Sequence, residues 1–144
     1  MKSDRYFEFA RHVAEMSDFE RAKVGAVAVL KDKVISTGHN SHKSHPLQKK
    51  YNQFRNFRDC GYINHSLHAE VACLLPLIDT EVDFSKVHLY VYRIRKDRPH
   101  GLARPCEACR NLLLDLGVRN VSYTTDCGVA EEHFDNRDGE KHSS

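Results

Sequence analysis

The residues best suited to chemistry in this chain are His68 and Glu70, together with the cysteine pair Cys106 and Cys109. One imidazole and two thiolates are typical ligands of Zn²⁺, and three protein ligands leave one position of a tetrahedral ion open for water. Zinc in such an open site lowers the pKa of its bound water from about 16 to about 7. Glu70 is then left as a carboxylate that can move protons. The four residues therefore predict a hydrolytic zinc centre.

These side chains need two helix starts that point at one place. Positions i and i+2 of a regular helix do not face each other. His68 and Glu70 can therefore reach the same metal site only if that site lies beyond the N-terminus of the helix, because helical side chains lean toward that end. The Cys106–Cys109 spacing puts both sulfurs on one side of a first helical turn, and Pro105 suits the entry to that helix. The partial positive charge of a helix N-terminus also favours thiolates.

Hydrophobic periodicity predicts two such helices and the strands between them. Helices are expected over 3–16, from His68 to Pro76, and over 107–116, where Gly117 stops the helix. Strands are expected over 24–30, 33–37, 87–94 and 121–124. Helices that alternate with strands predict an α/β fold, a three-layer α/β/α sandwich around a central mixed sheet. The tail 131–144 is polar and is expected to be loosely held.

Length and composition suit an ordinary globular protein. The 144 residues, of which 40% are hydrophobic, predict one domain over 1–144 with a core at about 5–125. No apolar run has the length of a membrane span, and the N-terminus lacks the apolar core of a signal peptide. Five cysteines, two of them in Cys-x-x-Cys, fit a reducing compartment. We expect a cytoplasmic protein with no membrane partner.

The net charge of +2 is small, but basic residues form two clusters. The stretch from Lys33 to Arg58 holds no acidic residue and includes Lys49 and Lys50. The second cluster leads up to the cysteine pair and consists of Arg93, Arg95, Lys96, Arg98 and Arg104. Each cluster is either solvated surface or a positive rim around an anionic ligand, which would be a nucleotide phosphate or a polynucleotide backbone.

His-x-Glu followed by Pro-Cys-x-x-Cys, with a strand between the two helices, resembles the cytidine and deoxycytidylate deaminase superfamily over roughly 5–125. The resemblance implies zinc bound by His68, Cys106 and Cys109, and a Glu70 that transfers protons without binding the metal. It also implies that Asn40 contacts the sugar, although an Asn at this point is also a good turn residue. Backbone amides of Ala69 and Cys106 are implied to contact the base.

The segment 46–51 makes the chain look most like deoxycytidylate deaminases of phage and bacterial type. The resemblance implies a small-molecule substrate, dCMP, which is converted to dUMP and ammonia while Lys49 and Lys50 hold the phosphate. The chain departs from that pattern at Ala72, His39 and Arg104. A deaminase of polynucleotides, acting on tRNA adenosine or single-stranded cytosine, is therefore kept as an alternative. A non-catalytic zinc-binding module is a further alternative.

Several other features leave alternatives open. Cys60 is a candidate fourth ligand that would close the zinc site, and Cys106 and Cys109 alone would also suit a redox pair or buried thiols. Cys60 with His42, His45 and His65 is a candidate second, structural zinc site, which some deoxycytidylate deaminases have. Tyr51, Phe54 and Phe57 suit packing better than base stacking. Relatives usually assemble, so the resemblance implies a homo-oligomer.

Overall fold

The computed structural model describes residues 2–20, 22–43, 45–53, 67–97 and 100–134. All of its named strands belong to one mixed sheet of order β2-β1-β3-β4-β5, in which β3 and β4 run parallel and the other neighbours are antiparallel. The strands are β1 (Val24–Leu30), β2 (Lys33–His39), β3 (His88–Arg93), β4 (Asn120–Thr124) and β5 (Val129–His133). The helices are α1 (Lys2–Ala14), α2 (Pro46–Asn52), α4 (Ala69–Leu74) and α5 (Glu107–Leu116), with short 3₁₀ turns at Leu75–Leu77 and Phe84–Lys86.

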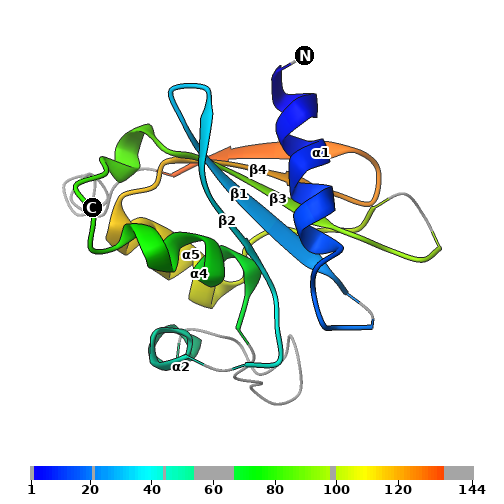
Figure 1. Ribbon diagram of the computed structural model, residues 1–144, viewed down its shortest axis with the longest axis horizontal. Coiled ribbons are helices and arrows are strands. Elements are labelled where there is room, and N and C mark those ends of the chain that lie inside the picture. The colour runs from blue at the N-terminus through cyan, green and yellow to red at the C-terminus, as the bar shows by residue number, and fades with distance from the viewer. Residues whose placement is uncertain (1, 21, 44, 54–66, 98–99, 135–144) are drawn as a thin grey trace, which may run out of the picture.

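Helices cover both faces of the sheet, as Figure 1 shows. α1 lies on one face, where Val27 and Val29 of β1 pack with its aromatic residues and Tyr90. α4 and α5 lie on the other face, where Ala26 and Ala28 join the larger core. β1 is buried on both faces because it is a Val- and Ala-rich interior strand with a neighbour on each side. The expected three-layer α/β/α sandwich is confirmed.

α4 lies unusually close to β2, because residue 38 is glycine. A Cβ atom at Gly38 would lie 2.2 Å from the backbone nitrogen of Cys73. Ser36 strengthens the same contact, since its hydroxyl donates to the Cys73 carbonyl at 2.6 Å. This packing sets the position of α4, and therefore of the residues at its start.

Most expected elements are present within a residue or two. α5 covers 107–116 and ends at Gly117, which has a left-handed φ of 93°. α4 ends at Leu74, just before Pro76. A bilayer-crossing segment is absent from the described residues, where each helix is too short or too polar to be one.

The expectation that the polar tail from residue 131 is loosely held was wrong for residues 131–134. Val129–His133 forms β5, an edge strand that pairs antiparallel with β4, and Phe134 is buried in the larger core. The core therefore extends beyond residue 125. The strand was missed because it carries the polar alternation of an edge strand and no large buried side chain of its own. Residues 135–144 lie outside the described residues.

Candidate active site

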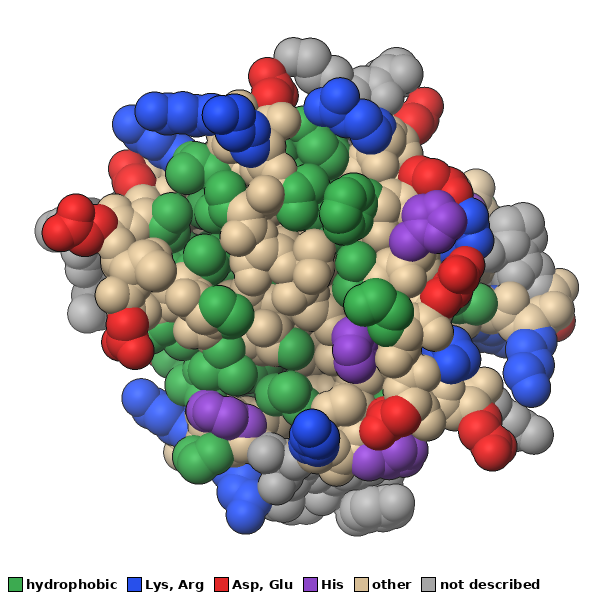
Figure 2. All heavy atoms as spheres, in the orientation of Figure 1, with side chains coloured by type: hydrophobic (Ala, Val, Ile, Leu, Met, Phe, Trp, Pro, Cys, Tyr) green, Lys and Arg blue, Asp and Glu red, His purple; other side chains and the backbone are tan. Residues whose placement is uncertain are grey.

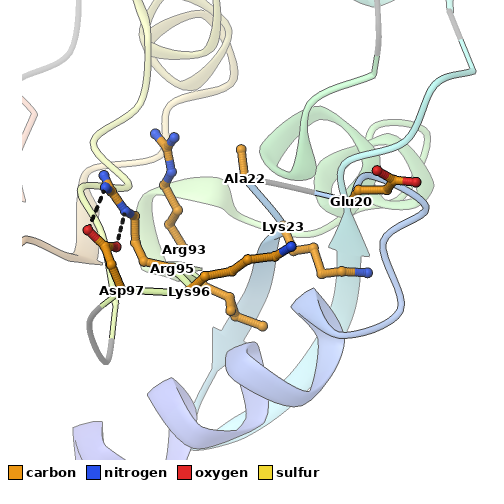
Figure 3. A pocket seen from close by; sticks show the side chains of 8 residues that line it. Glu20, Ala22, Lys23, Arg93, Arg95, Lys96 and Asp97 are labelled. Carbon is orange, nitrogen blue, oxygen red and sulfur yellow. Dashed lines mark hydrogen bonds and ion pairs between the residues drawn. The ribbon is translucent and has the colours of Figure 1, made fainter.

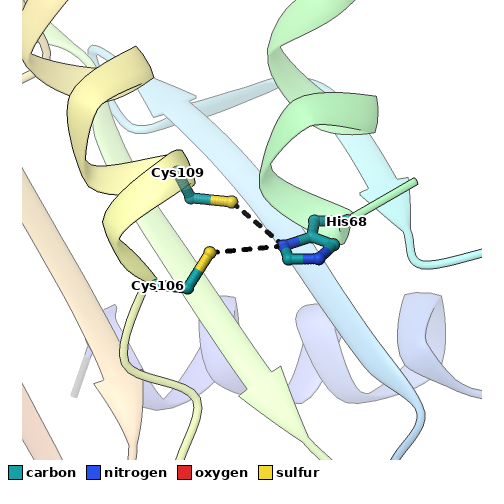
Figure 4. Close-up of side chains that lie close together, drawn as sticks. All are labelled: His68, Cys106 and Cys109. Carbon is teal, nitrogen blue, oxygen red and sulfur yellow. Dashed lines mark hydrogen bonds between the residues drawn. The ribbon is translucent and has the colours of Figure 1, made fainter. Parts of the chain in front are cut away.

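The starts of α4 and α5 meet on the face of the sheet opposite α1, as the close-up in Figure 4 shows. His68 is the residue immediately before α4, Cys106 holds the same position before α5, and Cys109 lies in the first turn of α5. The Nδ1 atom of His68 lies 3.6 Å from the sulfur of Cys106 and 3.4 Å from that of Cys109. The two helix N-termini thus bring together ligands that are 38 and 41 residues apart in the chain.

The spacing of these donor atoms fits a zinc ion. Zn–N bonds of about 2.1 Å and Zn–S bonds of about 2.3 Å at tetrahedral angles separate nitrogen from sulfur by about 3.6 Å. Both observed separations agree with that value to within about 0.2 Å. Among the described residues, this trio forms the cluster of His, Cys, Asp or Glu side chains able to hold a metal. With three ligands among the described residues, it matches the open zinc sites of the catalytic kind.

The two thiols affect each other's ionisation. A hydrogen bond from Cys109, with smaller contributions from His68, lowers the pKa of Cys106 to about 3 despite its burial. The same hydrogen bond, together with complete burial, raises the pKa of Cys109 well above its usual value. The site therefore already favours one thiolate, and a divalent cation among the three donors would favour the second.

Glu70 lies in the first turn of α4 and is only 6% exposed. Burial raises the pKa of its carboxyl, while the neighbouring imidazole of His68 lowers it and Cys106 raises it further. A carboxyl with a raised pKa next to a metal site is suited to accept a proton and release it again near neutral pH. Glu70 is not part of the metal-binding trio found among the described residues, and its role as a proton carrier stays a prediction.

His68 is held in place by a buried glutamine on α2. Gln48, which has no exposed surface, accepts a hydrogen bond from the backbone nitrogen of His68 at 3.0 Å. Its amide nitrogen donates to the side chain of Asn52 at 2.8 Å, and Asn52 is itself buried. Gln48 therefore acts as a positioning residue for the metal ligand.

A cavity of about 330 Å³ opens beside this cluster. Its wall combines residues at the starts of α4 and α5 with residues at the edge of the sheet. The lining residues are Phe19, Ala22, Val24, Asn40, His68, Ala69, Glu70, Arg93, Ala103, Arg104 and Cys106. The predicted contacts Asn40, Ala69 and Cys106 thus lie in one cavity with the ligand His68 and with Glu70.

Asn40 has a structural role in addition to its place in the cavity wall. Its side-chain oxygen accepts from the backbone nitrogen of Val24 at 3.0 Å, and its amide nitrogen donates to the Ala22 carbonyl at 2.8 Å. These bonds hold the chain where it enters β1. The amide keeps a second N–H and a second lone pair, so both sequence interpretations of this residue are compatible with the geometry.

Lys49 and Lys50 lie elsewhere. Both are exposed on α2 and are not among the lining residues of the cavity, so their predicted contact with a phosphate stays a prediction. Tyr51 on the same helix is buried and donates to the carboxylate of Asp115 on α5 at 2.6 Å, which supports packing as its role. Phe54 and Phe57 lie outside the described residues.

The candidate second zinc site is only partly described. Cys60 and His65 lie outside the described residues, and so does any closure of the first site by Cys60. His45 accepts a hydrogen bond from the backbone nitrogen of Leu47 and so caps α2. His42 stacks on Phe19 with ring centroids 4.0 Å apart.

The fold brings to the site Phe19, which no sequence pattern indicated, and two arginines that the sequence indicated only as members of a basic cluster. Phe19 comes from the loop before β1, Arg93 from the end of β3, and Arg104 from the connection to α5. Arg104 is held by Glu132 of β5 at 2.6 Å, and the Tyr123 hydroxyl donates to the same carboxylate at 2.7 Å. The one available signal was the basic cluster to which both arginines belong.

Comparison with known proteins agrees with this geometry. Residues 1–125 match the family model described as the cytidine and deoxycytidylate deaminase zinc-binding region. A comparison with curated proteins finds no match. A cytidine deaminase from Burkholderia pseudomallei has the same fold, at 21% identity and a TM-score of 0.61 over 92% of this chain and 93% of that one.

The fold is also shared with the dCMP deaminase of cyanophage S-TIM5. In its complex with dCMP and dUMP, that protein aligns at 20% identity with a TM-score of 0.59, over 85% of this chain and 80% of that one. At these identities the two structures establish the fold, while the family match covers most of the chain together with its metal ligands. The protein therefore belongs to the zinc-dependent cytidine and deoxycytidylate deaminase family, and His68, Cys106 and Cys109 are the residues that could hold its zinc.

Proposed function

We propose that this protein hydrolyses the exocyclic amine of a free cytosine nucleotide, with dCMP as substrate and dUMP and ammonia as products. The observation that carries the proposal is a site with three ligands among the described residues and a buried carboxyl, Glu70, in the wall of the same cavity. A closed structural zinc site has no need for that carboxyl. Its presence favours an enzyme over a zinc-binding module.

Zinc held by His68, Cys106 and Cys109 would supply a Lewis acid that lowers the pKa of water in the cavity. Glu70 takes a proton from the attacking water and delivers it to the ring nitrogen as the oxygen adds to C4. The same carboxylate then takes the proton of the new C4 hydroxyl and passes it to the departing amine. The C–N bond breaks, ammonia leaves and the uracil carbonyl forms.

The remaining cavity residues suit a nucleotide. Asn40 has an amide N–H that we assign to a sugar hydroxyl, and the backbone of Ala69 adjoins the base position. Arg93 and Arg104 add positive charge to the wall, which favours an anionic substrate over an uncharged nucleoside. The cyanophage protein with the same fold has been crystallised with dCMP and dUMP, which supports the same substrate class here.

A polynucleotide substrate is the second candidate. Both basic clusters favour it, but acidic and basic side chains are intermixed around the face shown in Figure 2, which is not the pattern of a continuous track for a phosphate backbone. Glu132 also offsets the charge of Arg104 at the cavity. These observations favour the free nucleotide.

Ammonia release from cytidine, deoxycytidine, CMP, dCMP, dCTP and short single-stranded DNA tests the proposal. We expect dCMP to have the highest kcat/KM. Glu70→Gln should lower kcat at least 100-fold while zinc content stays at the wild-type level, because proton transfer contributes about 10²- to 10⁴-fold. Glu107→Gln, the same change at an exposed first-turn position of α5, serves as the matched control and should retain activity.

Two results would contradict the proposal. Full activity of the Glu70→Gln variant would remove the assigned proton carrier. Turnover of single-stranded DNA without turnover of any free nucleotide would establish the second candidate.

A further inference from the structure

A second cavity, of about 500 Å³, adjoins the zinc-site cavity. The two share Ala22 and Arg93 in their walls, so one arginine borders both spaces. Figure 3 shows the side chains that line the second cavity. They are Glu20, Ala22, Lys23, Arg93, Ile94, Arg95, Lys96 and Asp97.

The register of the sheet brings these residues together. Arg93 at the end of β3 is paired with Val24 at the start of β1, and the backbone nitrogen of Ile94 donates to the Lys23 carbonyl at 2.9 Å. Further along the chain, Gly101 forms an isolated antiparallel bridge with Arg93. Lys23 is therefore placed beside basic residues that lie about 70 positions later in the chain.

The cavity is cationic, with two arginines and two lysines against two carboxylates. Asp97 forms an ion pair with Arg95, with oxygen–nitrogen distances of 3.2 and 3.3 Å, and therefore offsets the charge of that arginine. Lys23 donates to the Ser17 carbonyl at 2.8 Å, which fixes the position of its ammonium group. With Glu20 counted against Lys23, the positive charge of Arg93 and Lys96 is left in the cavity wall.

The guanidinium of Arg93 includes a buried hydrogen-bond donor, Nε, that has no acceptor among the described residues. In Figure 3 the Arg93 side chain runs beside Arg95 and takes no part in the Arg95–Asp97 ion pair. A buried donor without a partner costs free energy, and a guanidinium binds phosphate oxygens with two parallel hydrogen bonds. A phosphate is the chemical group that would satisfy it.

We propose that this second cavity, with Arg93 at the boundary, binds the phosphate of the nucleotide whose base occupies the zinc-site cavity. This inference rests on the proposed function and moves the phosphate contact from Lys49 and Lys50 on α2 to the segment that follows β3. Lys96 is exposed and extends across the cavity in Figure 3, so it adds charge where a phosphate would enter. Arg93 thereby distinguishes nucleotides from nucleosides.

The test compares nucleotide with nucleoside in zinc-loaded protein. Arg93→Gln should lower kcat/KM for dCMP about 10- to 100-fold, because a hydrogen bond to a charged group is lost. The same variant should weaken binding of the product dUMP, measured by calorimetry, by a similar factor. The kcat/KM for deoxycytidine and the affinity for deoxyuridine should each stay within about threefold of wild type. A merely structural role of Arg93 would instead affect nucleotide and nucleoside alike.

Two further variants complete the design. Lys96→Gln is an exposed change that leaves the fold intact, and it should weaken dUMP binding about two- to fivefold without affecting deoxyuridine. Lys33→Gln, an exposed control at the start of β2 beside the far end of β1, should match wild type for both ligands. Equal losses for nucleotide and nucleoside in Arg93→Gln and no effect of Lys96→Gln would overturn the inference.

A selective loss of dUMP binding in Lys49→Gln or Lys50→Gln, with none in Arg93→Gln, would also overturn it. Failure of the proposed function can be told apart from failure of this inference. If the protein deaminates no cytosine nucleotide, its binding of dUMP and of deoxyuridine can still be compared. Tight dUMP binding that depends on Arg93 would then support the phosphate site alone. Equal binding of dUMP and deoxyuridine by the wild-type protein would refute it.

Discussion

Replacing Gln48 with Met tests whether a buried amide on α2 holds the metal ligand. The change keeps side-chain length and removes two hydrogen bonds, one from the backbone nitrogen of His68 at 3.0 Å and one to Asn52 at 2.8 Å. Each group left without a partner costs about 1–3 kcal/mol. We expect the variant to lose about 2–4 kcal/mol of unfolding free energy.

Zinc affinity should fall as well. Residues that orient a metal ligand typically contribute about 10- to 100-fold to affinity. Gln48 holds the backbone of His68 directly, so we expect a loss within that range. Urea unfolding measures the stability, and competition with a zinc chelator measures the affinity. Once saturated with zinc, the variant should retain kcat within a few-fold, because Gln48 is absent from the cavity wall.

The matched control is Gln53→Met, the same substitution at an exposed position immediately after α2. It should leave both the urea midpoint and the zinc affinity unchanged. If Gln48→Met also matched wild type in both measurements, the hydrogen bond to His68 would have no role in forming the site.

Two other predictions concern the fold. Gly38→Ala puts a Cβ atom 2.2 Å from the backbone nitrogen of Cys73, so α4 must move; we expect a loss of more than 1 kcal/mol in urea unfolding and weaker zinc binding. Unchanged zinc affinity would show that α4 can shift without affecting the ligands. Burial lowers the pKa of His88 from 6.5, although Glu131 opposes the shift. Protonation of His88 therefore favours the unfolded chain, and stability is full above pH 6.5 and falls as the pH drops below it. His88→Gln should reduce this acid destabilisation between pH 7 and 5, whereas exposed His12→Gln should not; identical pH profiles for wild type and His88→Gln would contradict the pKa shift.

The metal site was predictable from residue order because its determinants are local. His68, Cys106 and Cys109 each stand at or within one turn of a helix start, and helix starts are set by neighbouring residues. Val-rich β1 and the Gly117 stop of α5 were predictable for the same reason. The three-layer arrangement followed from the alternation of such elements.

The wall around the zinc site depended on contacts between distant parts of the chain. Arg93 reaches both cavities only because β3 pairs with the start of β1, and Gln48 reaches His68 from 20 residues away. β5 has no strong hydrophobic pattern and forms by pairing with β4, which then places Glu132 beside Arg104. Local sequence thus predicted the metal ligands and the proton carrier. Strand register and helix packing, which no single segment contains, decided what surrounds them.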